Sequence, residues 1–497
     1  MERLGGRSAG IGWLAFISLV FYGISEPWHL LVILPSIAFN FSVGIHLARS
    51  PDPRLLFAAI ATNLGLLGYF KYSNFVIENL FVFADMPPPA INVVLPAGIS
   101  FYTFTQIAFL VDSYRQQARE VNFSRYALFV TFFPHLIAGP IIHHAEMLPQ
   151  FAKGARGINS RNVSIGLSIL IIGLAKKVLI ADNLALVATP VFDATLQGET
   201  LTFFEAWAAA LAYTFQLYFD FSAYSDMAIG LSLMFGIKMP INFNSPYKAQ
   251  NIVEFWRRWH MTLSRFLLDY LYIPLGGNRH GAPRMFAALL ATMLLGGLWH
   301  GAGWTFIIWG ALHGTYLVIN HAWRQATKEI RFEVGPLRHV FTTLSWATTF
   351  IAVTAAWVVF RAETLDAAII VWKSMAGFNG LSFPAPAEQR LGSLAGILSS
   401  LGVVFDGNNI VTLEDWRTLG IPLILIAGLI CVIAPNTQQL FARYKPALPV
   451  YNGQLPSPSE TKWQWRPTPF WVFSMAGIGV ICLLSLNRIS EFIYFRF

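Results

Sequence analysis

The feature that most constrains this chain is a series of long apolar stretches that recurs along it. They fall at 11–24, 28–48, 55–70, 90–111, 126–142, 164–190, 203–236, 285–299, 303–323, 340–360, 418–435 and 468–487. A helix crosses a bilayer core with about 20 apolar residues, and lipid offers the backbone no hydrogen-bond partner. The pattern therefore predicts an all-α polytopic membrane protein with about 11–12 transmembrane helices.

Charged side chains are too scarce for a soluble protein. They make up 12% of the 497 residues, against about 25% in soluble globular domains. The formal net charge of +8 comes from cations scattered between the apolar runs. Such cations are typical of loops that set topology and touch lipid headgroups, so we expect a lipid bilayer and no nucleic acid as partner.

Segment 250–275 combines a helical pattern with too many charges to face lipid. Its ionisable residues are Glu254, Arg257, Arg258, His260, Arg265 and Asp269. They predict a re-entrant or interfacial helix that lines a polar cavity, with Trp256, His260 and Ser264 on one face. The arginines either hold a phosphate-bearing donor or bind lipid headgroups, and His260 is either catalytic or part of an interfacial belt.

Two further histidines lie in polar parts of apolar stretches. His300 ends an apolar run beside Gly301 and Gly303, where backbones can approach closely. An imidazole with an ordinary pKa near ~6.5 can take a hydroxyl proton, although helix packing is the alternative role. His313 shares a predicted helical stripe with Trp309, Tyr316 and Asn320, where inter-helix hydrogen bonding is favoured over direct catalysis.

Two carboxylates, Asp220 and Asp226, interrupt the apolar segment 203–236. Buried carboxylates need partners, and the arginines of 257–265 are the candidates for structural ion pairs. The alternative is the proton relay of a transporter.

The sequence predicts no metal site. His143 and His144, with Glu146 and His135, match no zinc-ligand spacing and are interpreted as a polar loop at the end of a span. The two cysteines lie far apart in apolar runs, which also argues against a disulfide framework. Residues 84–90 predict a stiff break, and the polar, proline-rich stretch 441–467 predicts an extramembrane loop.

Several stretches recur in an order that is typical of one family. They lie at 64–72, 95–115, 132–140, 218–230, 255–281, 296–314, 357–377 and 492–495. The specific part is Trp-Arg-Arg-Trp-His at 256–260 together with Trp-His-Gly at 299–301. On these motifs the sequence resembles the membrane-bound O-acyltransferase (MBOAT) superfamily, within it the bacterial branch containing the membrane subunit of alginate O-acetylation.

The resemblance implies a single integral-membrane domain over 1–497, with a catalytic core at about 60–380 and helices around a central tunnel. The essential histidine of the family maps onto His300, its second polar catalytic position onto His260, and a further histidine of the bacterial branch onto His313. Arg257 and Arg258 are hypothesised to attract the anionic donor.

The resemblance also implies an activity in the bacterial inner membrane. Members move an acyl group from a cytosolic thioester, here expected to be acetyl-CoA, to a hydroxyl. The expected acceptor is an exopolysaccharide of the alginate type or a periplasmic SGNH-like acetyltransferase partner. The alternatives are another acyl group or acceptor (D-alanyl, peptidoglycan, cellulose or lipid) and a proton-coupled transporter.

Overall fold

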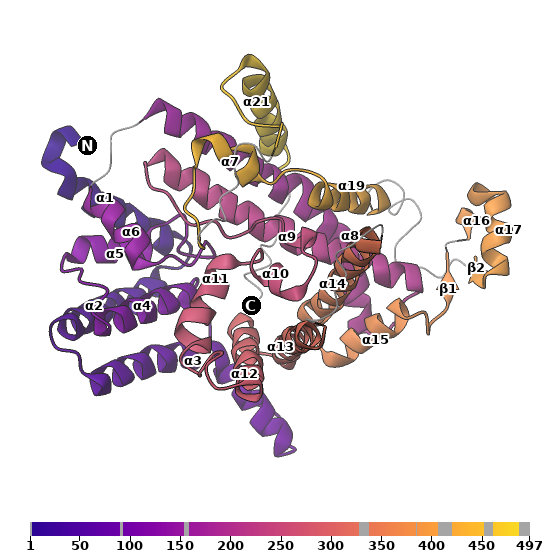
Figure 1. Ribbon diagram of the computed structural model, residues 1–497, viewed down its shortest axis with the longest axis horizontal. Coiled ribbons are helices and arrows are strands. Elements are labelled where there is room, and N and C mark those ends of the chain that lie inside the picture. The colour runs from indigo at the N-terminus through magenta and orange to yellow at the C-terminus, as the bar shows by residue number, and fades with distance from the viewer. Residues whose placement is uncertain are drawn as a thin grey trace.

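The computed structural model describes residues 2–89, 93–153, 159–327, 337–383, 385–405, 420–451 and 461–486, and within them nearly every regular element is a helix (Figure 1). Two two-residue strands, β1 (Leu381–Ser382) and β2 (Val403–Val404), pair in parallel. The predicted all-α class is confirmed. The terminal family-like stretch at 492–495 lies outside the described residues.

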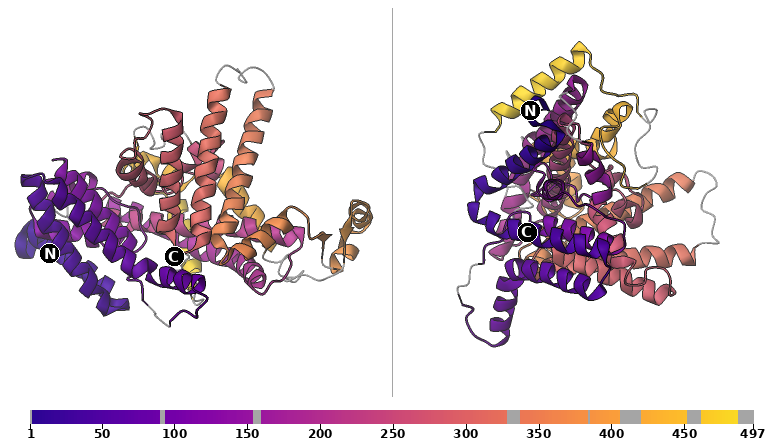
Figure 2. Two further views of the ribbon diagram at one scale, coloured as in Figure 1. Left: turned by 90° about the horizontal axis from the view of Figure 1, so that it is seen from below. Right: turned by 90° about the vertical axis from the view of Figure 1, so that its left-hand side faces the viewer.

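The N-terminal helices gather at one end of the molecule, in indigo and purple in Figures 1 and 2. They are α1 (Glu2–Ser25), η1 (Pro27–His29), α2 (Leu30–Arg49), α3 (Pro53–Phe83), α4 (Ile99–Tyr114), α5 (Phe123–Thr131) and α6 (His144–Ala152). Asp52 caps α3 by accepting a hydrogen bond from the Arg54 backbone N–H, with proline at the first helical position. The predicted break follows the end of α3 at Phe83.

The expected span at 126–142 was wrong. The helix α5 ends at Thr131, and the chain then passes through mostly buried turns until α6 begins. A Cβ on Gly139 would lie 2.4 Å from the Cα of His135, so the tight turn requires glycine. Pro140 follows it and lacks the N–H that a continuing helix would need.

A long helical pair forms the centre of the molecule. One member is continuous through α7 (Ser160–Ala175), the π-helical turn η2 (Lys176–Ala181) and α8 (Asp182–Leu196), and the other is α9 (Phe203–Met234). A Cβ on either Gly166 or Gly230 would lie 2.5 Å from the carbonyl oxygen of the other, so the two backbones pack in direct contact. These helices confirm the predicted stretches at 164–190 and 203–236.

The C-terminal half supplies the helices around the candidate site. They are η3 (Pro246–Lys248), α10 (Ile252–Trp256), α11 (Met261–Leu267), η4 (Leu268–Tyr272), α12 (Ala282–His300), α13 (Trp304–Ala326), α14 (Leu337–Arg361), α15 (Leu365–Met375), α16 (Pro386–Leu391), α17 (Ser393–Ser400), α19 (Ile421–Val432), α20 (Thr437–Leu440), η6 (Ala442–Tyr444) and α21 (Pro469–Leu484). Figures 1 and 2 show α16 and α17 at the end of the molecule opposite to the N-terminal helices.

Within the described residues, five helices are long and apolar enough to cross a membrane. They are Pro27–Arg49, Pro53–Phe83, Ser160–Leu196, Ala282–His300 and Arg338–Arg361. Shorter apolar helices lie at Ala9–Ile24, Ile421–Val432 and Pro469–Leu484. Large apolar side chains such as Phe57 and Phe473 point outward on these helices, at 75% and 76% exposure. An outward apolar surface is what a multi-pass membrane protein presents to lipid.

Part of the stretch 441–467 packs against the protein body. Phe441 and Trp465 are buried, and their rings lie 5.4 Å apart between centroids. The backbone N–H of Leu448 donates to the carbonyl oxygen of Met239. Met239 lies in the segment between α9 and η3, which leads on to α10. The described ends of this stretch therefore support the elements that hold the site.

Candidate active site

The helix predicted over 250–275 is broken at His260. The segment α10 ends at Trp256, α11 begins at Met261, and His260 between them adopts left-handed backbone angles, φ 40° and ψ 53°. The face that Trp256, His260 and Ser264 would share on one helix is therefore not formed. Instead the Ser264 hydroxyl donates to the Trp256 carbonyl oxygen over 3.0 Å, which closes the break.

A non-glycine residue in this conformation is strained by about 1–3 kcal/mol and persists only where its surroundings hold it. Two backbone hydrogen bonds do so here, from the Met261 N–H to the Asn242 carbonyl oxygen and from the Asn244 N–H to the Arg258 carbonyl oxygen. Both join the break to the chain segment that precedes η3. The strain therefore marks His260 as a position held for its side chain.

Asn242 fixes the tautomer of His260. The side-chain oxygen of Asn242 accepts hydrogen bonds from the backbone N–H and the hydroxyl of Thr262, while its amide nitrogen donates to Ser225. The same oxygen lies 3.1 Å from His260 Nδ1, so Nδ1 must be the donor. In the neutral ring Nε2 then keeps a free lone pair, and Nε2 forms no hydrogen bond with any described residue. His260, fully buried, thus presents a hydrogen-bond acceptor on Nε2.

His300 lies at the C-terminal end of α12, inside an enclosure of aromatic rings. Its ring centroid is 5.0 Å from that of Trp299, 5.1 Å from Trp309 and 5.3 Å from Phe360. The His260 ring centroid is 6.5 Å away, and His300 is only 6% exposed. The structure therefore brings together His260 and His300, two of the histidines singled out by the sequence, which lie 40 positions apart in the chain.

The end of α12 is held by two side chains of α3. The ammonium group of Lys71 donates to the carbonyl oxygens of Trp299 at 2.5 Å and His300 at 3.1 Å, and the Tyr72 hydroxyl donates to that of Leu298 at 2.8 Å. The last carbonyls of a helix have no partner within the helix, and a cation there also favours the helix dipole.

Sequence analysis missed this role of Lys71. The available signal was a lone lysine in a 31-residue apolar helix, where an ionisable side chain needs a specific partner. The partner itself lies 229 positions further along the chain.

His313 lies behind Trp309 on α13, where the predicted stripe is confirmed. Its ring centroid is 4.8 Å from that of Trp309 and 5.7 Å from that of Tyr316. The indole N–H of Trp256 donates to His313 Nδ1 over 3.3 Å. Because Nδ1 accepts, the neutral ring carries its proton on Nε2, and His313 has the opposite tautomer to His260.

The arginines next to His260 differ in their contacts. Arg258 binds Glu254 through two nitrogens, at 3.0 and 2.7 Å, and also donates to the Asn244 carbonyl oxygen. Arg257 is exposed. Arg265 forms an ion pair with Glu146 of α6. Binding of a phosphate-bearing donor by Arg257 and Arg258 stays a prediction.

The predicted pairing of Asp220 and Asp226 with arginines was wrong, although both carboxylates are paired. Lys177 lies 2.7 Å from Asp220, and Lys176 lies 2.6 Å from Asp226, which also accepts a hydrogen bond from Thr437. Both lysines belong to the π-helical turn η2, which packs against α9. A cavity of about 300 Å³ adjoins the Lys176 pair, and its lining includes none of the three histidines discussed above.

The fold and these motifs agree with the comparison with known proteins. Residues 60–360 match the family model described as MBOAT, membrane-bound O-acyltransferase family. The chain belongs to this family and is an O-acyltransferase, which confirms the resemblance seen in the sequence.

Its relatives differ in their named acceptors. The peptidoglycan O-acetyltransferase of Helicobacter pylori is 46% identical over 400 residues, which cover 74% of each chain. The probable alginate O-acetylase AlgI of Pseudomonas aeruginosa is 42% identical over 376 residues, which cover 74% of this chain and 69% of that protein. The teichoic acid D-alanyltransferase of Streptococcus thermophilus is 29% identical over 248 residues, which cover 47% of this chain and 58% of that protein.

Proposed function

We propose that this protein moves an acetyl group from cytosolic acetyl-CoA to a hydroxyl group across the bacterial inner membrane. The acceptor is a hydroxyl of an alginate-like exopolysaccharide or of a periplasmic SGNH-like partner that passes the acetyl group on. The observation that carries the proposal is the buried pair of His260 and His300 in an aromatic enclosure. Relatives at 42–46% identity that are named as O-acetyltransferases support the acetyl group.

Acyl transfer from a thioester needs a base for the incoming hydroxyl, donors for the oxyanion and exclusion of water. In the proposed reaction His300 takes the hydroxyl proton while the oxygen attacks the acetyl carbon. The C–S bond of the thioester then breaks, an ester C–O bond forms, and the proton passes to the leaving thiolate. The rings of Trp299, Trp309 and Phe360 keep water from hydrolysing the thioester.

The two tautomers assign complementary roles to the other histidines. His260 offers a lone pair on Nε2, so it orients His300 or accepts a proton rather than donating to a carbonyl oxygen. His313 carries its proton on Nε2 and offers a hydrogen-bond donor on the other side of Trp309. Arg257 and Arg258 would attract the anionic donor by charge.

The contacts of the buried carboxylates support an enzyme over a transporter. A proton relay needs carboxylates that release and take up protons, whereas each of Asp220 and Asp226 lies within 2.7 Å of a lysine ammonium. Such pairs stabilise the ionised carboxylate.

The names of the relatives indicate different transferred groups and acceptors. The two O-acetyltransferase relatives are more similar to this chain than the D-alanyltransferase, and they align over a larger share of it. We therefore favour acetyl over D-alanyl as the transferred group, and a glycan as the final acceptor.

The test uses the full-length protein in liposomes with radiolabelled acetyl-CoA outside. Wild-type protein should consume acetyl-CoA and label an alginate oligosaccharide or a purified SGNH-like partner, whereas His300→Ala should not. Transfer of D-alanine or of a long acyl chain in place of acetyl would contradict the proposed donor. Solute uptake driven by a proton gradient, without acyl transfer, would contradict the enzyme.

A further inference from the structure

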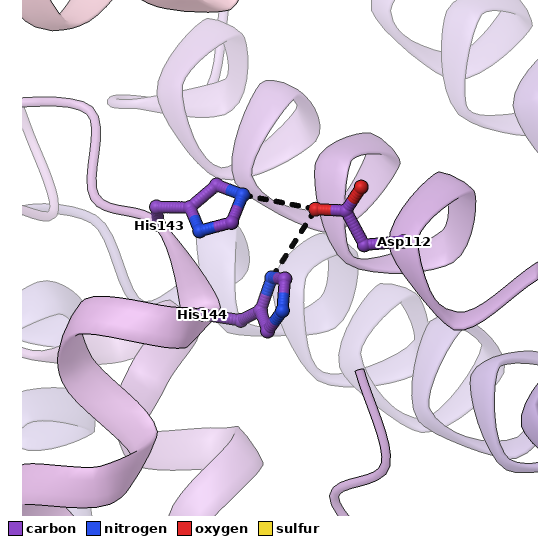
Figure 3. Close-up of side chains that lie close together, drawn as sticks. All are labelled: Asp112, His143 and His144. Carbon is purple, nitrogen blue, oxygen red and sulfur yellow. Dashed lines mark hydrogen bonds and ion pairs between the residues drawn. The ribbon is translucent and has the colours of Figure 1, made fainter. Parts of the chain in front are cut away.

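A second group of ionisable side chains lies outside the histidine enclosure. Asp112 stands in the last turn of α4, and His143 and His144 stand at the start of α6. Figure 3 shows both imidazoles turned toward the one carboxylate. His143 Nε2 lies 2.9 Å and His144 Nδ1 lies 3.3 Å from the same oxygen, Asp112 Oδ2.

These separations are short enough for the three side chains to share one metal ion. One ligand atom from each of the three residues lies within 4.8 Å of the other two. A zinc ion bound tetrahedrally at about 2.0–2.1 Å holds its ligand atoms about 3.3 Å from one another. The distance from His144 Nδ1 to Asp112 Oδ2, 3.3 Å, equals that value, and the distance from His143 Nε2, 2.9 Å, is shorter.

Hydrogen bonding accounts for only part of this cluster. The Tyr270 hydroxyl donates to Asp112 Oδ2 over 2.5 Å, and His143 Nε2 approaches the same oxygen at hydrogen-bond distance. These two donors use the lone pairs of that oxygen. His144, 5% exposed, points Nδ1 at the same oxygen from 3.3 Å, as a third polar group. Three polar groups that converge on one buried carboxylate oxygen call for an explanation.

We propose that Asp112, His143 and His144 bind one divalent transition-metal ion, with Zn²⁺ as the best match. Two imidazoles and a carboxylate are ligands that Zn²⁺ takes. Arg115 approaches the other carboxylate oxygen, Oδ1, at 3.8 Å and leaves Oδ2 to the ion. The sequence pattern missed the site because Asp112 lies 31 positions before His143.

Metal binding moves one proton on His143. Without an ion, His143 Nδ1 accepts the Ala145 backbone N–H over 3.3 Å, so the neutral ring carries its proton on Nε2. Coordination needs the lone pair of Nε2, so the proton passes to Nδ1 and the contact with Ala145 is given up. The Tyr270 hydroxyl, 3.0 Å from His143 Nε2, would lie beside the ion.

The ion would join two elements that are far apart in the chain, and a third already binds one of its ligands through a hydrogen bond. Asp112 belongs to α4, the histidines to the start of α6, and Tyr270 to η4. The segment α11–η4 begins next to His260, and Arg265 on it already binds Glu146 of α6. A bound ion would therefore hold Asp112, to which Tyr270 at the far end of this segment donates its hydrogen bond, and the site lies outside the histidine enclosure.

The test measures zinc retained by the full-length protein in detergent, purified without a polyhistidine tag. The protein is stripped with EDTA, loaded with Zn²⁺, desalted, and analysed by mass spectrometry of the metal. We expect one ion per wild-type chain and near-complete loss in Asp112→Asn and His144→Ala. The control is His280→Ala, which removes an exposed histidine and should retain the ion.

A second variant keeps the test decisive if a buried substitution prevents folding. The side chain of His143 is 26% exposed, so His143→Ala should give a monodisperse protein. Its dissociation constant for Zn²⁺ should rise at least about 10-fold, because one of three ligands is lost. Wild-type protein that retains no zinc, or equal retention by wild type and the folded ligand variants, would overturn the proposal.

Discussion

Lys71 is the residue through which the structure connects a membrane helix to the geometry of His300. Replacing it with methionine keeps most of the length and the unbranched apolar stem of the side chain but removes both hydrogen bonds to the end of α12. Charge-assisted hydrogen bonds each contribute about 1.5–3 kcal/mol, so the pair contributes at least about 3 kcal/mol to holding this helix end. The freed carbonyls must seek other partners, and the His300 ring moves with them.

A displacement of a catalytic group by about 1 Å can cost about 100-fold in rate. We therefore expect Lys71→Met to lower kcat by about that factor with little change in KM, since Lys71 binds the backbone of α12 and is separate from the arginines proposed to attract the donor. The assay is the initial rate of acetyl transfer in liposomes at saturating acetyl-CoA, with thermal unfolding followed in parallel.

Tyr72→Phe is the matched control on the same helix. It removes one neutral hydrogen bond to the Leu298 carbonyl oxygen, worth about 1 kcal/mol, and leaves the carbonyls of Trp299 and His300 bound. Its rate should fall by less than about 10-fold. A folded Lys71→Met protein with a rate within about twofold of wild type would refute the reasoning.

Substitutions at Asn242, Asp226 and Gly230 test the contacts that hold the site and the helices around it. Asn242→Leu should lower kcat at least about 10-fold in the transfer assay, because His260 Nδ1 loses the oxygen that fixes its tautomer. Asn242→Asp keeps an accepting oxygen there, so its kcat should fall by less. Asp226→Asn leaves Lys176 without its charged partner and should lower the free energy of unfolding by about 3–5 kcal/mol, measured as a lower midpoint of denaturation. The double variant Asp226→Asn/Lys176→Met should recover much of this lost stability. Gly230→Leu should prevent the contact of α9 with α7 and abolish the monodisperse peak in size-exclusion chromatography, because its Cβ would lie 2.5 Å from a backbone oxygen.

The apolar periodicity was sufficient to predict the long helices. The stretches at 164–190 and 203–236 became α7–α8 and α9, because a helix in lipid satisfies its own backbone hydrogen bonds. The stripe of His313 on α13 was likewise predictable from helical spacing alone. At 126–142 the apolar composition was misleading, because α5 ends at Thr131 and the chain continues as mostly buried turns through Gly139 and Pro140.

The features that sequence analysis missed depend on contacts between distant segments. The break at His260 is held by Asn242 and by Ser264, and a helical pattern read along 250–275 contains no sign of it. The partners of Asp226 and of Trp299 are lysines 50 and 228 positions away, on helices whose approach is set by packing. Local spacing identifies which side chains need a partner, whereas the fold decides which partner they meet.

The central claim is that the imidazole of His300 takes part in acyl transfer, and the most direct measurement is the turnover rate of His300→Gln. Glutamine keeps the polarity and much of the volume of the side chain but cannot act as a base near neutral pH. With His280→Gln as a control on the exposed surface, the account predicts a loss of at least about 100-fold in kcat for His300→Gln and none for the control. A folded His300→Gln protein that transfers acetyl within about twofold of the wild-type rate would contradict it.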